Sequence, residues 1–354
     1  MRIIVTGGGT GGHIFPALEI IKELKKKPDM DVVWAGNANS FEEKTALDNH
    51  ITFFALGTKK IVGQGFFKKI TALFALLVAV IQCLQFLLKQ RPQAVIGVGG
   101  YVSAPLILAS FLLGIRRYIA EQNVVPGLAN RYLGKIATKV FMSFHESQRY
   151  FPKGKTILTG NPVRADFFGL ARTQKPEALR ILITGGSMGA QFINKTIPEA
   201  LAELHGQGLA LTITHQTGHA MVADTQKTYE NLGLRAHVTP FIAHMPHAFI
   251  EHDLIISRAG ATIIAELTAS GTPSILIPYP FALGHQQKNA EVLVDKKAAI
   301  MILQGPDAKS RLVTTLKNIY SDRSILHHMA QQALSLGIPH AASNMVQCIL
   351  TDIA

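Results

Sequence analysis

Cysteine is scarce in this chain of 354 residues, which contains only Cys83 and Cys348. The two form no CxxC pair and lie in apolar stretches with a helical pattern, so we expect buried thiols in a reducing compartment and no disulfide framework. Acidic residues are also few, since 23 Asp and Glu stand against 35 Lys and Arg, a formal net charge of +12. This excess predicts a polyanionic partner: a phosphate-rich substrate, nucleic acid or an anionic membrane surface.

Aromatic residues make up only 7% of the chain, and no RNA- or DNA-binding signature accompanies the charge. Nucleic acid is therefore the least favoured of the three partners. The G-x-x-x-x-G-K-[ST] phosphate loop is absent, which argues against an ATPase. The first apolar run, Ile3–Val5, is too short for a signal peptide and ends in glycines.

Long hydrophobic runs are absent with one exception, Ile70–Leu88, which is almost long enough to span a bilayer. Gln82 and Gln85 interrupt it, and a buried strand is expected directly after it, so a span would divide one domain between two sides of a membrane. The preceding segment, Lys59–Lys69, interleaves lysines with apolar residues, which suits an anionic bilayer interface. A surface-seeking helix is the favoured interpretation, an ordinary crossover helix the alternative, and a spanning helix the least favoured.

Two glycine-rich loops are the main feature that is present. Gly7–Gly12 follows the apolar strand Arg2–Thr6, Gly185–Gly189 follows Leu179–Thr184, and a helix-like stretch follows each loop. Glycine permits positive φ and close approach of a ligand, and a helix N-terminus offers unpaired N–H groups and partial positive charge to an anion. The repeat and the chain length predict two α/β domains whose anion-binding edges face one cleft.

Strand-like and helical patterns alternate through both halves, which predicts parallel sheets covered by helices on both faces. A Gly/Pro interruption at Thr159–Arg164 places the join, giving domains 1–161 and 162–336 and a helical tail, 337–354, that would pack back on the first domain. The expected strands are Ile3–Val5, Val32–Ala35, Ala94–Val98, Arg117–Ala120, Lys139–Met142, Leu179–Ile183, Leu209–Thr214, Ala236–Val238, Leu254–Ser257 and Ser274–Pro278.

The first glycine loop formally satisfies the dinucleotide fingerprint G-x-G-x-x-G. The second strand ends in Gly36 and Asn37 without the acidic residue that would hold a ribose, so NAD is disfavoured. His13 lies in the first turn of the helix behind the loop, where the positive helix end would help to keep an imidazole neutral. We interpret it as a general base; the alternative is a histidine that caps the helix or binds phosphate.

A second glycine group, Gly97–Ser103, follows another strand of the same domain and supplies backbone amides for a second phosphate. The alternative is a tight turn between strand and helix. Glu121–Asn123 ends the next strand and places polar groups at the same carboxyl edge, where α/β sheets bind ligands.

In the second domain, Ser257–Glu266 runs from a strand through small residues into a helix, so that a diphosphate could lie against the helix N-terminus. Glu266 lies one turn further on and could accept hydrogen bonds from both ribose hydroxyls; the alternative is a solvated helix glutamate. Gln286 and Gln287 open a later helix, and amides of this kind are suited to sugar hydroxyls.

Two patterns that resemble metal motifs are discounted. Asp29–Asp31 resembles a DxD motif but precedes a strand, so we interpret it as a surface turn at the opposite edge. His215 and His219 have HxxxH spacing, but the residues between them indicate a loop, and no metal site is expected.

Seven segments together resemble the MurG family of bacterial peptidoglycan glycosyltransferases. They are Gly7–Leu18, Gly97–Pro105, Glu121–Asn130, Thr159–Arg164, Gly185–Asn194, Ser257–Leu267 and Pro278–Ala290. The chain departs from the family pattern at Ala120, where histidine is common, and at Met188, where glutamine is frequent. The resemblance implies a GT-B fold, with two Rossmann-like domains and an interdomain cleft. It also implies inverting transfer of N-acetylglucosamine from UDP-N-acetylglucosamine to the C4 hydroxyl of undecaprenyl-diphospho-N-acetylmuramoyl-pentapeptide.

The resemblance also implies site residues. His13 would take the C4 hydroxyl proton, and Gly99, Gly100, Tyr101 and Ser103 would face the acceptor diphosphate. Ile242 would read uracil through its backbone, Glu266 would hold the ribose, and departing UDP would be stabilised without a metal or cofactor. The implied donor contacts are Thr10, Gly11, Gly12, Asn123, Arg164, Ser187, Ile242, Ala261, Thr262, Ile263, Ile264, Ala265, Glu266, Gln286 and Gln287.

The family further implies a peripheral enzyme on the cytoplasmic face of the bacterial membrane, docked through the surface around Ile61–Leu88. Pairing with other cell-wall synthesis or division proteins is implied by the family, although no residue signals it. Three alternatives remain: a GT-B enzyme acting on another lipid such as diacylglycerol, a nicotinamide oxidoreductase, and a non-enzymatic membrane-recruitment module. The last would leave His13, Glu266 and Gln286 unexplained.

Overall fold

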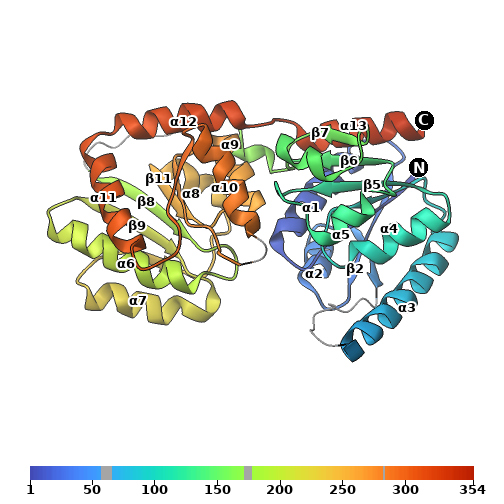
Figure 1. The fold of residues 1–354 in the computed structure, drawn as a ribbon, viewed down its shortest axis with the longest axis horizontal. Coiled ribbons are helices and arrows are strands. Elements are labelled where there is room, and N and C mark those ends of the chain that lie inside the picture. Colours follow the sequence, from blue (N-terminus) through green and yellow to red (C-terminus); the bar gives the residue numbers. More distant parts are fainter. Residues whose placement is uncertain (57–65, 171–177, 282–283) are drawn as a thin grey trace. The chain divides into compact units, whose positions relative to one another are not determined.

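The computed structural model describes residues 1–56, 66–170, 178–281 and 284–354. These residues form two compact units, of which the first comprises Met1–Val163 with His340–Ala354 and the second comprises Arg164–Pro339. In Figure 1 each unit contains a sheet with helices packed around it. All sheet pairings are parallel, which confirms the predicted fold class.

The sheet of the first unit has seven strands in the order β3-β2-β1-β4-β5-β6-β7. Central strand β1 pairs with β2 on one side and β4 on the other, so that Val5 lies opposite both Trp34 and Ile96. The strand order reverses between β1 and β4, and the loops that follow these two strands therefore flank the position where α/β sheets bind ligands. The strands are β1 (Arg2–Thr6), β2 (Asp31–Asn37), β3 (Thr52–Leu56), β4 (Ala94–Gly97), β5 (Arg116–Glu121), β6 (Lys139–Met142) and β7 (Thr156–Leu158).

Helices cover both faces of this sheet because successive side chains of a strand point to opposite sides. Ile3 and Val5 of β1 pack in one core with α1 and the C-terminal helix α13, whereas Ile4 packs in a second core with α3 and α4. The helices of this unit are α1 (Gly11–Lys25), α2 (Phe41–Asp48), α3 (Phe66–Gln90), α4 (Ser103–Leu112), α5 (Leu128–Leu133), the 3₁₀ helix η1 (His145–Tyr150) and α13 (Ala341–Ile353).

Helix α3 carries the long hydrophobic run that the sequence singled out. Its inner face buries Cys83 and Phe86, while a stripe at helical spacing stays exposed: Phe74, Leu77, Val78, Ile81 and Leu88. No helix in the described part of the chain has the length and hydropathy of a membrane span. The lysine-rich residues 59–65 and the side chains of 66–73 lie outside the described part.

The sheet of the second unit has six strands in the order β10-β9-β8-β11-β12-β13. Its order reverses between β8 and β11, so this unit has the same kind of switch point as the first. The strands are β8 (Leu179–Thr184), β9 (Leu211–Gln216), β10 (His237–Thr239), β11 (Leu254–Ser257), β12 (Ser274–Leu276) and β13 (Ala299–Met301). The helices are α6 (Gln191–Gly206), α7 (Val222–Asn231), α8 (Met245–Glu251), α9 (Ala261–Ser270), α10 (His285–Asp295), α11 (Ala308–Ser321), α12 (Ser324–Leu336) and the 3₁₀ helices η2 (Ala165–Phe167) and η3 (His219–Met221).

Some local predictions are wrong. The strands β3, β7 and β13 were not predicted, and all three are sheet edges. Of the predicted loop between His215 and His219, Gln216 still belongs to strand β9, whereas Thr217 and Gly218 lie in a loop. The His215 ring is buried with hydrogen bonds to Asn194 and Tyr229. Cys348 is only partly buried, because α13 lies at the surface of its unit.

Candidate active sites at the carboxyl edges of the two sheets

In the first unit, the two glycine-rich loops after β1 and β4 pack directly against each other. A Cβ atom on Gly100 would lie 2.5 Å from the carbonyl oxygen of Gly8, and Gly100 has φ of +81°. Only glycine satisfies both conditions. The Asn37 side chain at the end of β2 donates a 2.9 Å hydrogen bond to the Tyr101 hydroxyl, which ties the second loop to the sheet.

His13 lies at the start of α1, between these two loops. Its Nδ1 atom is 3.1 Å from the carbonyl oxygen of Val98 and 3.3 Å from Oε1 of Gln122. A Cβ atom on Gly99 would lie 2.7 Å from the same Nδ1, so the ring position requires glycine there. Burial lowers the pKa of His13, and its hydrogen bonds with Gln122 and Val98 oppose this effect. The imidazole is therefore neutral at pH 7 and able to accept a proton.

Two side chains of the predicted polar triplet at the end of β5, Glu121 and Gln122, are buried. The Glu121 carboxylate is buried and accepts hydrogen bonds from the Asn123 backbone (2.8 Å) and the Asn130 side chain (2.9 Å). Burial raises the pKa of Glu121, while these hydrogen bonds lower it. Glu121 thus stabilises the loop, and Asn123 remains partly exposed. Ala120, where the family commonly has histidine, lies in the core at 1% exposure.

Glu42 is a residue that the sequence reasoning missed. It belongs to the first turn of α2 and is 1% exposed, yet its carboxylate lies under the first glycine loop. It accepts 3.3 Å hydrogen bonds from the backbone N–H groups of Gly9 and Asn37. In the sequence Glu42 is indistinguishable from an acidic residue that complements the helix N-terminus.

In the second unit, the N-terminus of α9 has no side-chain cap, and the Thr262 hydroxyl oxygen is buried without a hydrogen-bond partner among the described residues. A buried hydroxyl of this kind is able to form a hydrogen bond with a bound ligand. Glu266 lies one turn further along the same helix. Burial raises the pKa of Glu266 to about 7, and the nearby Arg164 guanidinium opposes this shift.

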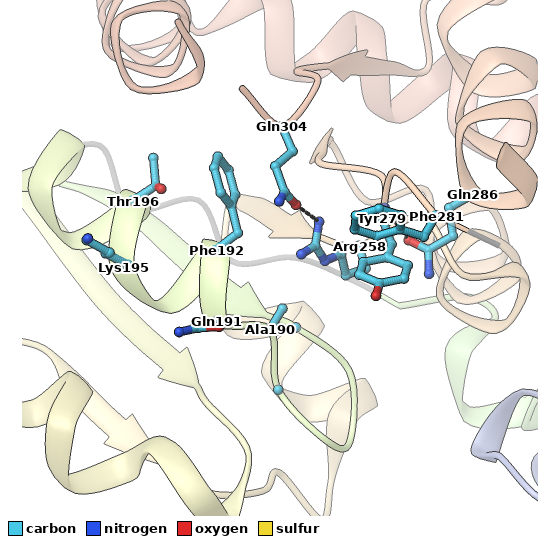
Figure 2. Close-up of a pocket in the computed structure, with 12 residues that line it drawn as sticks. Ala190, Gln191, Phe192, Lys195, Thr196, Arg258, Tyr279, Phe281, Gln286 and Gln304 are labelled. Atoms are coloured by element: carbon cyan, nitrogen blue, oxygen red, sulfur yellow. Dashed lines mark hydrogen bonds between the residues drawn. The ribbon is translucent and has the colours of Figure 1, made fainter. Parts of the chain in front are cut away.

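A cavity of about 640 Å³ opens at the carboxyl edge of the second sheet, lined by residues of α6, α10 and the loops that follow β8, β11, β12 and β13 (Figure 2). Gln286 lines it, and its Oε1 accepts hydrogen bonds from the backbone N–H groups of Ala259 (3.2 Å) and Tyr279 (2.9 Å). The carbonyl end of this amide is therefore occupied, and its NH₂ group is left to donate. The other lining residues are Gly185, Gly189, Ala190, Gln191, Phe192, Lys195, Thr196, Arg258, Phe281 and Gln304.

Arg258 is the second functional candidate that the sequence reasoning missed. It is only 9% exposed, and one guanidinium nitrogen donates to the carbonyls of Ile277 (3.0 Å) and Pro278 (3.2 Å) and to Gln304 (3.2 Å; Figure 2). No carboxylate of the described residues pairs with it, and burial lowers its pKa. A buried cation that lines a cavity and lacks a counter-ion is suited to bind an anion.

The other predicted donor residues of this unit occupy different positions. Ser187 and Met188 are exposed on the loop after β8, and Met188, where the family often has glutamine, is 84% exposed. Ile242 is partly buried between β10 and α8. Gln287 donates to Glu291 on its own helix at 3.2 Å. In the described ranges, no three His, Cys, Asp or Glu side chains cluster as metal ligands.

Comparison with known proteins identifies the family. The sequence matches the N-terminal domain of glycosyltransferase family 28 over residues 3–142 and the C-terminal domain of that family over residues 180–345. The chain belongs to glycosyltransferase family 28. Within family 28, it is 40% identical to the UDP-N-acetylglucosamine–N-acetylmuramyl-(pentapeptide) pyrophosphoryl-undecaprenol N-acetylglucosamine transferase of Syntrophus aciditrophicus, over 100% of this chain and 99% of that protein. It is 37% identical to the enzyme of the same name from Myxococcus xanthus, over 98% and 91%.

Solved structures agree with this membership. The family 28 chain is similar to the crystal structure of Acinetobacter baumannii MurG with a TM-score of 0.82 and 32% identity, covering 99% of each chain. It also resembles a UDP-GlcNAc 2-epimerase from Neisseria meningitidis bound to UDP-GlcNAc, with a TM-score of 0.70 and 16% identity over 99% of this chain and 100% of that one. At that identity the second likeness concerns the fold alone. The predicted GT-B architecture is confirmed.

Proposed function

We propose that this family 28 chain is a MurG-type enzyme, which transfers N-acetylglucosamine from UDP-N-acetylglucosamine to the lipid-linked N-acetylmuramoyl-pentapeptide (lipid I) and so forms lipid II. One observation carries this conclusion. Over its full length the chain is 40% identical to an enzyme named for this transfer. The side chains described above give the reaction a physical basis.

The second unit supplies most of the donor site in this proposal. The diphosphate lies against the N-terminus of α9, where the Thr262 hydroxyl has no hydrogen-bond partner among the described residues. Glu266, one turn away, accepts hydrogen bonds from the ribose hydroxyls. Arg258 offers its unpaired charge to the diphosphate, and the NH₂ group of Gln286 donates to the sugar. The remaining proposed donor contacts in this unit are Arg164, Ser187, Ile242, Ala261, Ile263, Ile264, Ala265 and Gln287.

The first unit supplies the base and the acceptor site. The loop of Gly99, Gly100, Tyr101 and Ser103 faces the acceptor diphosphate, and Thr10, Gly11, Gly12 and Asn123 complete the donor contacts. Two observations support His13 as the base. Burial lowers its pKa, so the imidazole is neutral at pH 7, and its ring lies among the glycines of the two loops. Such a group contributes about 10²–10⁴-fold to a rate.

The chemistry is a single in-line displacement. The acceptor C4 hydroxyl oxygen attacks C1 of the donor sugar, and the bond from C1 to the β-phosphate oxygen of UDP breaks with inversion. The hydroxyl proton passes to His13. The charge that develops on the leaving diphosphate is stabilised by the α9 N-terminus and the Arg258 guanidinium, which are already in place before the reaction.

The exposed stripe of α3 supports attachment to the membrane that holds the acceptor lipid. Phe74 and Leu88 at its two described ends are 68% and 60% exposed, and α4, which packs beside α3, exposes Leu112 at 64%. Apolar patches of this kind mark interaction sites. The net charge of +12 favours an anionic bilayer surface. We propose peripheral attachment on the cytoplasmic side, where UDP-sugars are available.

The test is transfer of labelled sugar from UDP-N-acetylglucosamine to a short-chain analogue of the muramoyl-pentapeptide lipid, in wild type and in His13→Ala. Turnover that is lost in His13→Ala while UDP binding persists supports both the reaction and the base. His50→Asn, a histidine change in the same unit but outside the site, is the matched control. Transfer to diacylglycerol instead of the peptide-bearing lipid would identify a different lipid glycosyltransferase.

A further inference from the structure

The hydrogen bonds around His13 fix the orientation of a neighbouring amide. The side chain of Gln122 is 2% exposed, and its nitrogen Nε2 lies 3.0 Å from the carbonyl oxygen of Val98 and 3.2 Å from that of Ala120. Carbonyl oxygens only accept hydrogen bonds, so the atom that faces both must be the NH₂ group. The amide oxygen Oε1 is thereby held toward His13.

The amide and the Val98 carbonyl together fix the position of the imidazole proton. His13 Nδ1 faces two acceptors, Val98 O at 3.1 Å and Gln122 Oε1 at 3.3 Å. If Nδ1 carried no hydrogen, its lone pair would face the lone pairs of two oxygen atoms and be repelled by them. Nδ1 therefore carries the hydrogen. Nε2 then carries the lone pair, and no described residue donates a hydrogen bond to it.

From this geometry we infer that Gln122 is a positioning residue that holds His13 as the Nδ1–H tautomer and leaves Nε2 to accept the acceptor's hydroxyl proton. The inference rests on the proposed role of His13 as the base. Nδ1–H remains a donor after Nε2 is protonated, so the same contacts support both states of the reaction. A neutral amide also orients the ring without the charge that would hold it protonated.

Gln122 is the position at which a substitution can change the charge beside the His13 ring. Among the described residues, titratable side chains at the loops and strand ends near the ring are Glu42 at the start of α2, Tyr101 before α4 and Glu121 at the end of β5. Glu42 and Glu121 both accept hydrogen bonds from backbone N–H groups, and Tyr101 accepts one from Asn37. Replacing Gln122 with glutamate would therefore add a new carboxyl group directly at Nδ1.

The test combines ¹⁵N spectra of histidine-labelled full-length protein with kinetics, and His13→Gln assigns the ring signals. In wild type we expect a protonated Nδ1 and an unprotonated Nε2. Gln122→Met should mix the tautomers and lower kcat on the order of tenfold, part of the general-base contribution, with KM for UDP-N-acetylglucosamine unchanged. Gln122→Glu should keep the tautomer, raise the midpoint of the ring titration by about one pH unit or more, and move the acid limb of the rate profile with it.

Gln93→Met is the matched control, because Gln93 accepts its hydrogen bond from Arg2 at the opposite edge of the same sheet. It should leave the ring signals and kcat unchanged, whereas a general loss of folding would affect both variants. A wild-type proton on Nε2, or a Gln122→Met protein with wild-type ring signals and kcat, would overturn the inference. Full turnover in His13→Ala would instead refute the proposed base, and the ring signals would still report on Gln122.

Discussion

Glu266 gives the donor site a pH dependence that can be worked out from the structure. Burial raises the pKa of this carboxyl to about 7, and only its ionised form accepts strong hydrogen bonds from both ribose hydroxyls. One pH unit below that pKa, about one-tenth of the molecules carry the charge. We therefore expect the Kd for UDP-N-acetylglucosamine to weaken about tenfold between pH 8 and pH 6, which corresponds to about 1.4 kcal/mol.

The assay is isothermal titration calorimetry of UDP-N-acetylglucosamine between pH 5.5 and 8.5. Binding that requires the carboxylate should release about half a proton per site at pH 7, measured by comparing buffers of different ionisation enthalpy. Glu266→Gln should bind weakly at every pH and release no proton. Arg164→Met should shift the midpoint to higher pH, because the Arg164 guanidinium lowers the pKa of Glu266.

The same carboxyl should affect the stability of the free protein in the opposite direction. Its pKa in the folded state, about 7, lies above the ordinary value of 4.5. The folded state therefore holds more protons in that window, and the free energy of unfolding falls as pH rises through it. At pH 8 Glu266→Gln should be more stable than wild type by at most about 3 kcal/mol, and near pH 4 the difference should vanish. A wild-type Kd that stays constant from pH 6 to 8, or an equal pH dependence in Glu266→Gln, would refute the reasoning.

Three further predictions concern the first unit. Gly99→Ala should abolish turnover, because the new Cβ would lie 2.7 Å from His13 Nδ1, and should lower stability by about 1–3 kcal/mol, because Gly99 has φ of +103°; melting curves measure the second effect, and UDP binding serves as the control for folding. Phe74→Asp with Ile81→Asp should weaken sedimentation with anionic vesicles by tenfold or more, about 1.5–3 kcal/mol per lost apolar contact, while transfer to a water-soluble acceptor stays unchanged. Asp352→Ala should lower the stability of this unit by about 2 kcal/mol, since its carboxylate accepts a 2.6 Å hydrogen bond from a lysine of β6; an unchanged melting temperature would contradict it.

The sequence predicted the centre of each sheet and, among the edge strands, β10, but it missed β3, β7 and β13. Strands β1 and β8 are almost wholly buried and are followed directly by glycines, so their apolar runs are distinct. The edge strand β3 alternates only weakly, with Thr52 exposed and Phe53 partly so, and β7 spans three residues of which none is fully buried. An edge strand needs to bury little apolar surface, and its pattern is therefore weak.

The sequence-based site predictions likewise succeeded for some residues and failed for others. Glycines and His13 could be singled out because their spacing relative to strand ends carries a geometric meaning. Glu42 and Arg258 could not, because what distinguishes them is the burial of a charged side chain, which the sequence does not show. Glu43, the neighbour of Glu42, lies at the surface side of α2 and accepts from Asn39 instead. Which of two adjacent glutamates lies beneath the loop depends on tertiary packing.

Arg258 and Glu266 of the second unit differ from the buried Glu121 of the first, and this difference bears on how the donor binds. In the first unit, the buried carboxylate of Glu121 is satisfied by hydrogen bonds from its own loop. In the second unit, Arg258 has no counter-ion among the described residues, and burial holds the pKa of Glu266 near 7. Both groups are costly in the free protein. A nucleotide sugar would relieve both, because its diphosphate can pair with the arginine and its ribose hydroxyls can donate to the carboxylate, so that the donor itself completes the hydrogen bonding of the site.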